Sequence, residues 1–137
     1  MTFEELEHTA DVRMRITAPT LPTLFAESGF ALAETLYGGY RRETPVAAFS
    51  INAEGKDWEE TIVNFLSELL LLIETEYLVP GSFDLVAEGG VIRGIVSGVL
   101  FDRTKHSGGI GVKGISYSGL SLEKITNGYE LTIIFDI

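Results

Sequence analysis

Residues 120–137 read LSLEKITNGYELTIIFDI and contain the clearest fold signal in the chain. Asn127-Gly128 separates two β-rich runs, and this dipeptide tolerates the positive φ angles that a type I′ hairpin turn requires. After the turn, the apolar residues at 129, 131, 133, 135 and 137 share one face of a strand, and Asp136 lies on the other face. The stretch therefore predicts an antiparallel hairpin with one buried face.

Three further β-rich runs precede this hairpin, at 83–87, 91–101 and 111–117. Turns that contain glycine separate them, because glycine adopts the backbone conformations that most residues avoid. The part of the chain after Pro80-Gly81 therefore predicts a β-meander.

The first half of the chain alternates strands and helices. Residues 12–18 alternate apolar and polar side chains, which predicts a strand. Apolar residues then recur at helical spacing over 20–36, with Thr20 at the start, and Gly38-Gly39 ends this helix.

A second strand, 46–52, leads into a second helix. Asp57 and Glu60 form a capping-box arrangement at its start, and its apolar stripe continues to Glu74. We therefore expect an α+β fold, in which a mixed or antiparallel sheet of about seven strands carries two helices packed on it. We expect residues 1–137 to form a single domain.

Charge and composition exclude several classes of protein. The 137 residues carry 20 Asp and Glu against 10 Lys and Arg, and this net charge of −10 repels nucleic acid. The absence of cysteine excludes a disulfide scaffold and thiolate metal sites. With two histidines, any metal would be held mostly by oxygen, which points to calcium, magnesium or manganese.

No segment of the sequence resembles a secretory signal or a membrane span. The N-terminal residues are acidic, and the longest purely apolar run covers only residues 69–73. We therefore expect a cytoplasmic protein that does not contact a membrane.

Two internal features have competing interpretations. Gly109, Gly111 and Gly114 match G-x-G-x-x-G, but strand residues follow where a dinucleotide site needs a helix, so we interpret them as turn glycines. Glu68 lies within the apolar stripe of the second helix. It is either a solvated side chain or an acid that supports a nearby site.

Polar residues near both ends and in one hairpin are also ambiguous. From periodicity alone, His8 is a loop histidine and Asp136 a solvated residue at the end of a strand. A basic cluster contrasts with the acidic remainder and is typical of a solvated hairpin; it contains Arg103, Lys105, His106 and Lys113.

Five motifs, taken in order, resemble the archease family. They are HTAD at 8–11, FLSELL at 65–70, DRTKH at 102–106, KGISY at 113–117 and DI at 136–137. Each motif is short, but their order and spacing extend over essentially the whole chain.

The resemblance implies an activator and not an enzyme. Archeases assist the RtcB-type RNA-splicing ligase, which joins tRNA halves and other broken RNAs with GTP and manganese. They promote formation of the guanylylated ligase intermediate. The implied function is therefore activation of an RtcB-type RNA ligase in tRNA splicing, with the ligase and not this protein holding the RNA.

The resemblance also implies a divalent-cation site near the chain ends. Its ligands would be Asp11, Asp136 and the α-carboxylate or carbonyl of Ile137, with calcium expected first and magnesium or manganese as alternatives. Three residues match family motifs and are expected to flank this site or contact the partner: His8, Lys105 and His106. Glu68 is a weaker candidate for the same role.

Two other functions remain open. One is a chaperone-like modulator of an RNA-modifying methyltransferase, an older interpretation of this family. The other is a stand-alone metal-dependent hydrolase or transferase that uses Asp11, Lys105 and His106. These residue types suit acid-base chemistry, but their spacing is not diagnostic.

Overall fold

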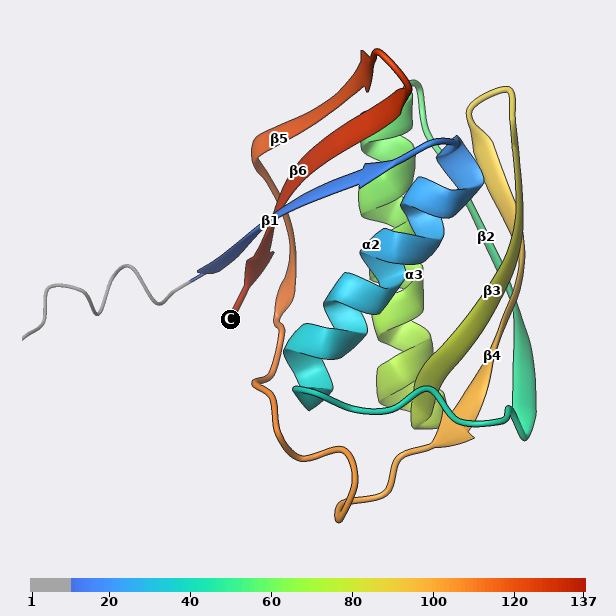
Figure 1. Ribbon diagram of the computed structural model, residues 1–137, viewed down its shortest axis with the longest axis vertical. Coiled ribbons are helices and arrows are strands. Elements are labelled where there is room, and N and C mark those ends of the chain that lie inside the picture. The colour runs from blue at the N-terminus through green and yellow to red at the C-terminus, as the bar shows by residue number, and fades with distance from the viewer. Residues whose placement is uncertain (1–10) are drawn as a thin grey trace, which may run out of the picture.

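A computed structural model describes residues 11–137, so His8 lies outside the described residues. Two helices and six strands make up this part of the chain (Figure 1). In chain order they are β1 (Asp11–Ala18), α2 (Leu21–Tyr37), β2 (Ala47–Glu54), α3 (Trp58–Glu76), β3 (Leu78–Glu88), β4 (Val91–Leu100), β5 (Gly114–Ile125) and β6 (Gly128–Asp136).

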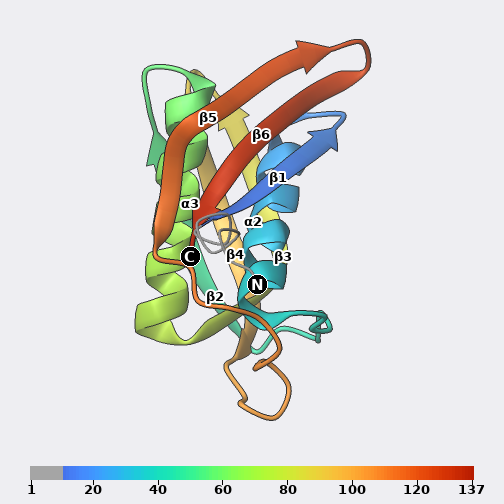
Figure 2. The same ribbon diagram turned by 90° about the vertical axis from the view of Figure 1, so that its left-hand side faces the viewer.

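The strands form two antiparallel sheets with the helices between them (Figure 1). One sheet has the order β1-β6-β5 and the other β2-β4-β3. Both helices contact both sheets, α2 through β1 and β3 and α3 through β5 and β2. Figure 2 shows the sheet of β5, β6 and β1 in front of the helices. The predicted α+β class, with antiparallel pairing and two packed helices, is confirmed.

The strand count differs from the expected seven. The runs predicted at 111–117 and 120–125 merge into one strand, β5, which begins at Gly114 and not at Gly111. The pairing of β5 with β6 shifts register between Ser116 and Ser121. Gly119 has a φ of 67° within this irregular stretch, so the strand bulges without being interrupted. β3 likewise begins at Leu78 and runs through Pro80-Gly81, where a bulge stands in place of the predicted break.

The helix starts are as predicted. The side chain of Thr20 accepts a hydrogen bond from the Thr23 amide and caps α2. Asp57 caps α3 by accepting from the Glu60 amide at 2.8 Å, and the Glu60 carboxylate accepts from the Lys56 amide at 2.7 Å. These bonds satisfy amides that have no partner inside the helix.

The hairpin between β5 and β6 is confirmed, but its turn type is not. β5 ends at Ile125 and β6 begins at Gly128, so the turn residues are Thr126 and Asn127. Within residues 11–137, Tyr77 is the one non-glycine residue with positive φ, so Asn127 does not have the type I′ conformation. Gly128 is needed for a different reason, because a Cβ there would collide with the carbonyl oxygen of Ala18.

The core fills the space between the two sheets. Phe25 of α2 and Phe65 of α3 pack edge to face with ring centroids 5.2 Å apart, and both are fully buried. Phe135 of β6 and Val96 of β4 close the core from opposite sides. No helix within residues 11–137 is long and apolar enough to span a membrane.

Candidate functional site

Two carboxylates lie side by side where β1 and β6 meet at one end. Asp11 is the first residue of β1 and pairs in antiparallel register with Asp136, the last residue of β6. Directly opposed residues project from the same face of a sheet, with Cβ atoms about 4.5–5.5 Å apart. Both side chains are exposed. The register therefore brings together the two aspartates for which the resemblance to archeases implies a cation site.

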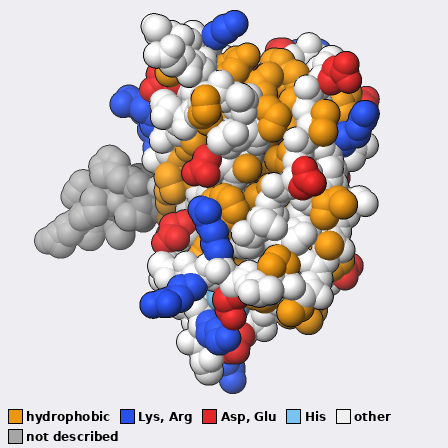
Figure 3. Space-filling model, turned by 45° about the vertical axis from the view of Figure 1, so that its right-hand side comes forward, with side chains coloured by type: hydrophobic (Ala, Val, Ile, Leu, Met, Phe, Trp, Pro, Cys, Tyr) orange, Lys and Arg blue, Asp and Glu red, His pale blue; other side chains and the backbone are white. Residues whose placement is uncertain are grey.

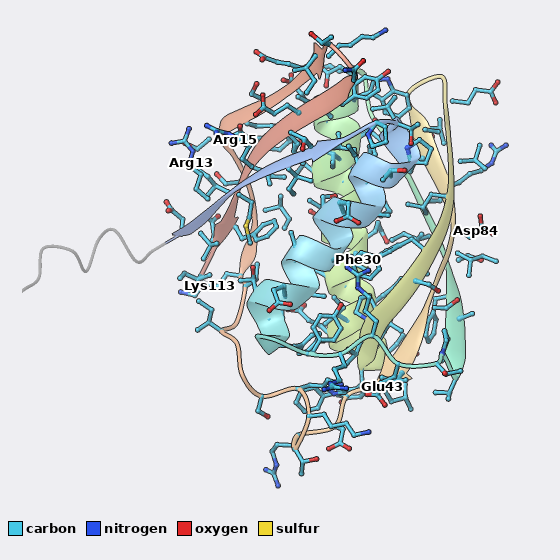
Figure 4. All side chains as sticks on the ribbon, viewed as in Figure 1. Arg13, Arg15, Phe30, Glu43, Asp84 and Lys113 are labelled. Atoms are coloured by element: carbon cyan, nitrogen blue, oxygen red, sulfur yellow. The ribbon has the colours of Figure 1, made fainter. Side chains whose placement is uncertain are left out.

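Within residues 11–137, the surroundings of this pair leave it open. On the other side of β6, Asp136 is opposite Gly114, which has no side chain, and an added Cβ there would meet no atom within 4 Å. The Lys113 amide donates a hydrogen bond of 2.6 Å to the Asp136 carbonyl and ties β5 to this end of β6. Arg13 lies two residues after Asp11, on the same face of β1, and Figure 4 shows Arg13 and Lys113 on this side of the molecule.

The donor set of this pair fits a hard cation. Two like charges directly opposed on neighbouring strands repel each other, and carboxylate oxygens are the ligands that calcium and magnesium prefer. Within residues 11–137, no group of three or more His, Cys, Asp or Glu side chains is arranged to hold a metal. Among the described residues, the main chain of Ile137, which directly follows Asp136, could add a further oxygen.

The motif DRTKH forms a self-contained turn after β4. The Asp102 carbonyl accepts hydrogen bonds from the amides of Lys105 and His106, at 2.9 and 2.8 Å. In return, the Asp102 amide donates to Nδ1 of His106 at 2.8 Å. The hydroxyl and amide of Thr104 both donate to Oδ1 of Asp102, and these bonds, the hydroxyl first, lower the pKa of the Asp102 carboxyl.

His106 is buried, with 2% of its surface exposed, so the interpretation of this residue as part of a solvated hairpin is wrong. The rings of Tyr37, Tyr40 and Phe101 pack around its imidazole, with centroids 5.6, 6.4 and 5.9 Å away. The other three residues of the basic cluster are exposed, as predicted: Arg103, Lys105 and Lys113.

Glu43, in the loop after α2, links the DRTKH turn to the rest of the molecule. Its Oε1 lies 3.2 Å from Nζ of Lys105, and its Oε2 lies 3.8 Å from Nε2 of His106. No sequence pattern predicts this role, because Glu43 is 62 residues away from Lys105 and belongs to no motif.

Two tyrosines hold the same region together. Their hydroxyls donate to main-chain carbonyls of β3, Tyr37 to Leu78 at 3.2 Å and Tyr40 to Pro80 at 3.0 Å. Burial raises the pKa of both phenols, that of Tyr40 to about 12. The walls around His106 are therefore fixed by hydrogen bonds as well as by packing.

The predicted site residues do not form one cluster. Lys105 and His106 contact Glu43, which Figure 4 shows at the lower end of the molecule, away from Lys113. The Lys113 amide binds the carbonyl of Asp136, so the Asp11–Asp136 pair lies with Lys113 and not with Glu43. Glu68 is exposed on α3 and lines a shallow depression of about 370 Å³ next to Asn52 and Glu54 of β2, in the other sheet.

The glycine motif has the predicted role of loop and turn. Gly109 and Gly111 lie in the connection between β4 and β5, and Gly114 begins β5. Because a strand and not a helix follows, the arrangement lacks the helix N-terminus that a dinucleotide site requires.

Residues 3–137 match the model of the archease protein family (MTH1598/TM1083). This chain belongs to the archease family. An archease from Pyrococcus furiosus is 34% identical over 130 residues, which cover 92% of this chain and 91% of that protein. An archease-like protein from Drosophila melanogaster is 33% identical over 147 residues, covering 100% of this chain and 91% of that protein.

Two solved structures share the archease fold seen here. The crystal structure of an archease and possible chaperone from Thermotoga maritima has a TM-score of 0.67 at 18% identity, covering 95% of this chain and 93% of that one. The solution structure of protein 1598 from Methanobacterium thermoautotrophicum has a TM-score of 0.71 at 16% identity, covering 94% of each chain. At these identities the likeness concerns the fold alone.

Proposed function

We propose that this protein activates an RtcB-type RNA-splicing ligase in tRNA splicing by promoting guanylylation of the ligase. Membership of the archease family supports the proposal. The single observation that carries it is the opposed pair of Asp11 and Asp136 on an exposed sheet face. In this proposal the protein is a binding partner and not an enzyme, and the nucleotide chemistry belongs to the ligase.

The cation proposed for this pair is calcium, with magnesium or manganese as alternatives. Asp11, Asp136 and a main-chain oxygen of Ile137 would hold it. When bound, the cation supplies a positive centre that attracts an oxyanion of the partner. Arg13 adds positive charge on the same sheet face, and the hydrogen bond between the Lys113 amide and the Asp136 carbonyl keeps the end of β6 in place.

The remaining candidates would contact the partner away from this pair. Lys105 is exposed on the DRTKH turn, and the buried His106 supports that turn from inside. Glu68 lies beside β2, on a surface that belongs to the other sheet. A ligase that contacts Asp136 and Lys105 together would span the connection from β4 to β5.

A guanylylation assay with the purified ligase, GTP and manganese tests the proposal. We expect the protein to increase formation of the ligase–GMP intermediate, and Asp11→Asn or Asp136→Asn to reduce this stimulation about tenfold or more, the usual loss for a disturbed metal site. Asp84→Asn is the matched control, because Asp84 is an exposed aspartate on β3 in the other sheet (Figure 4).

Two results would contradict the proposal. One is an unmodified protein that leaves ligase guanylylation unchanged, which would favour the methyltransferase-chaperone interpretation. The other is turnover of GTP by the protein without ligase, which would favour an enzyme.

A further inference from the structure

The imidazole of His106 carries a buried hydrogen-bond donor that has no partner among the described residues. Nδ1 accepts from the Asp102 amide at 2.8 Å, so in this arrangement the ring proton is on Nε2. Nε2 is buried and makes no hydrogen bond within residues 11–137. The nearest carboxylate oxygen, Oε2 of Glu43, is 3.8 Å away, which is too long for a hydrogen bond.

Packing fixes the direction of this donor. The rings of Tyr37, Tyr40 and Phe101 surround the imidazole, and the bond from the Asp102 amide holds its opposite edge. A buried donor without an acceptor is unfavourable, and native proteins carry few of them. The structure of residues 11–137 therefore leaves the Nε2 donor free for an acceptor that displaces the Glu43 carboxylate beside it.

A pocket of about 410 Å³ lies next to this donor. Its lining comes from two loops and contains Gly39, Tyr40, Arg41, Glu43, Lys105 and His106. Arg41 and Lys105 bring two positive charges, and Glu43 brings one negative charge. Among the lining side chains the positive charges therefore outnumber the negative one, in a chain with twice as many acidic as basic residues.

The loops around the pocket are also rich in cations. Four of the ten Lys and Arg residues belong to the segments 38–46 and 101–113, without counting Lys113: they are Arg41, Arg42, Arg103 and Lys105. Figure 3 shows basic side chains gathered at the lower end of the molecule, with acidic side chains among them. Such a concentration favours an anionic ligand.

The donor geometry favours a phosphate over a single carboxylate. Glu43 already places a carboxylate between the donors, and it reaches Lys105 at 3.2 Å but stays 3.8 Å from His106. A phosphate group has at least three acceptor oxygens, enough for one each to His106, Lys105 and Arg41, which all line the pocket. We propose that this pocket binds a phosphate group, either free or carried by a nucleotide, and that Glu43 competes with it for the two donors.

This inference goes beyond the proposed function, since it concerns a site separate from the Asp11–Asp136 pair. Long-range proton–nitrogen NMR on the full chain can follow the His106 ring nitrogens while inorganic phosphate or GMP is added at constant ionic strength. We expect a saturable shift of Nε2. Similar affinities for the two ligands would indicate recognition of the phosphate alone, and tighter GMP binding would indicate a phosphate carried by a nucleoside.

His106→Asn separates the ligand role from a structural one. The side-chain oxygen of Asn can replace Nδ1 as the acceptor for the Asp102 amide, while the Nε2 donor is lost. Phosphate binding can be measured from the amide chemical shifts of the turn. The affinity should fall about tenfold or more, which is the loss expected for a hydrogen bond to a charged group.

Glu43→Gln tests the competition without changing a residue of the turn. It removes the negative charge and keeps an oxygen for Lys105, so phosphate should bind about fivefold more tightly, as removal of a like charge at close range predicts. Glu88→Gln changes the net charge equally at the far end of β3 and should change affinity less than about twofold. Equal effects of Glu43→Gln and Glu88→Gln, or no saturable shift with either ligand, would overturn the proposal.

Discussion

Asp11 and Asp136 are directly opposed in the antiparallel pairing of β1 with β6, although 124 positions separate them in the sequence. Their neighbours across the sheet are Gly114 and the amide of Lys113, so no side chain on β5 covers Asp136 from that side. Opposed like charges on paired strands destabilise a sheet. The arrangement is therefore unfavourable by itself, and we expect the proposed cation, shared between the two carboxylates, to offset the repulsion.

Asp11→Asn should therefore change stability in opposite directions with and without a cation. In buffer that contains a chelator, loss of the repulsion between the two carboxylates should raise the free energy of unfolding by about 0.5 kcal/mol. With calcium at about 100 times its dissociation constant, the unmodified protein should gain about 2.7 kcal/mol, and the variant should gain little. Urea unfolding in both buffers measures the difference. Asp84→Asn should behave as the unmodified protein does, and an equal calcium effect in Asp11→Asn would exclude Asp11 as a ligand.

The part of the fold that sequence predicts is the part decided by neighbours in the chain. The caps at Thr20 and Asp57 follow from residues three positions apart, and both are as predicted. The division of the strands into two sheets depends on which distant strands pair, and no local pattern encodes that choice. The continuity of β5 is also not encoded locally. Gly119 is typical of a turn, and only the pairing of β6 with residues before and after Gly119 shows that the strand continues.

The candidate site also contains both residues that a local motif indicates and residues whose role depends on distant contacts. Family motifs identified Asp11, Asp136 and His106, but burial of His106 depends on Tyr37 and Tyr40, which lie more than 60 positions earlier in the sequence. Periodicity gave no information about a loop residue of this kind. Glu43 was missed because its carboxylate acquires a role only when two loops meet.

Thr104→Val should raise the pKa of Asp102 toward its ordinary value, because the Thr104 hydroxyl is the main cause of the lowering. A carboxyl whose pKa is lowered by folding stabilises the fold above its unfolded pKa, about 3.9, and loses that contribution as the pH falls through its folded pKa. The stability difference between the two proteins should therefore shrink below about pH 4. Carbon NMR of the Asp102 carboxyl measures the pKa. Thr75→Val, on α3, removes a hydroxyl that contacts only a main-chain carbonyl and should leave that pKa unchanged.

Tyr40→Phe should reduce the loss of stability at alkaline pH. Burial raises the pKa of Tyr40 to about 12, whereas an unfolded tyrosine titrates near 10. A group whose pKa is raised by folding contributes its full stability below the unfolded pKa and loses it as the pH rises through the folded one. At neutral pH the variant should be about 1 kcal/mol less stable, since the hydrogen bond to the Pro80 carbonyl is lost. Above about pH 10 the two urea-unfolding curves should converge. Curves that stay parallel would show that Tyr40 ionises equally in both states.

The last prediction is that the protein binds RNA weakly on its own. Its net charge of −10 opposes a polyanion, and the cations concentrated at one end are only Arg41, Arg42, Arg103 and Lys105. If all four contacted phosphates of a single strand, the logarithm of the binding constant would fall with the logarithm of salt concentration with a slope of about −3 at most. Fluorescence anisotropy with labelled tRNA halves should therefore show no saturation at micromolar protein in physiological salt.

Adding the ligase should produce binding whose salt dependence has the slope of the ligase alone, because the phosphate pocket holds one phosphate group and not a backbone. Sub-micromolar binding by the isolated protein with a steeper slope would contradict this and place an RNA surface outside the cationic end.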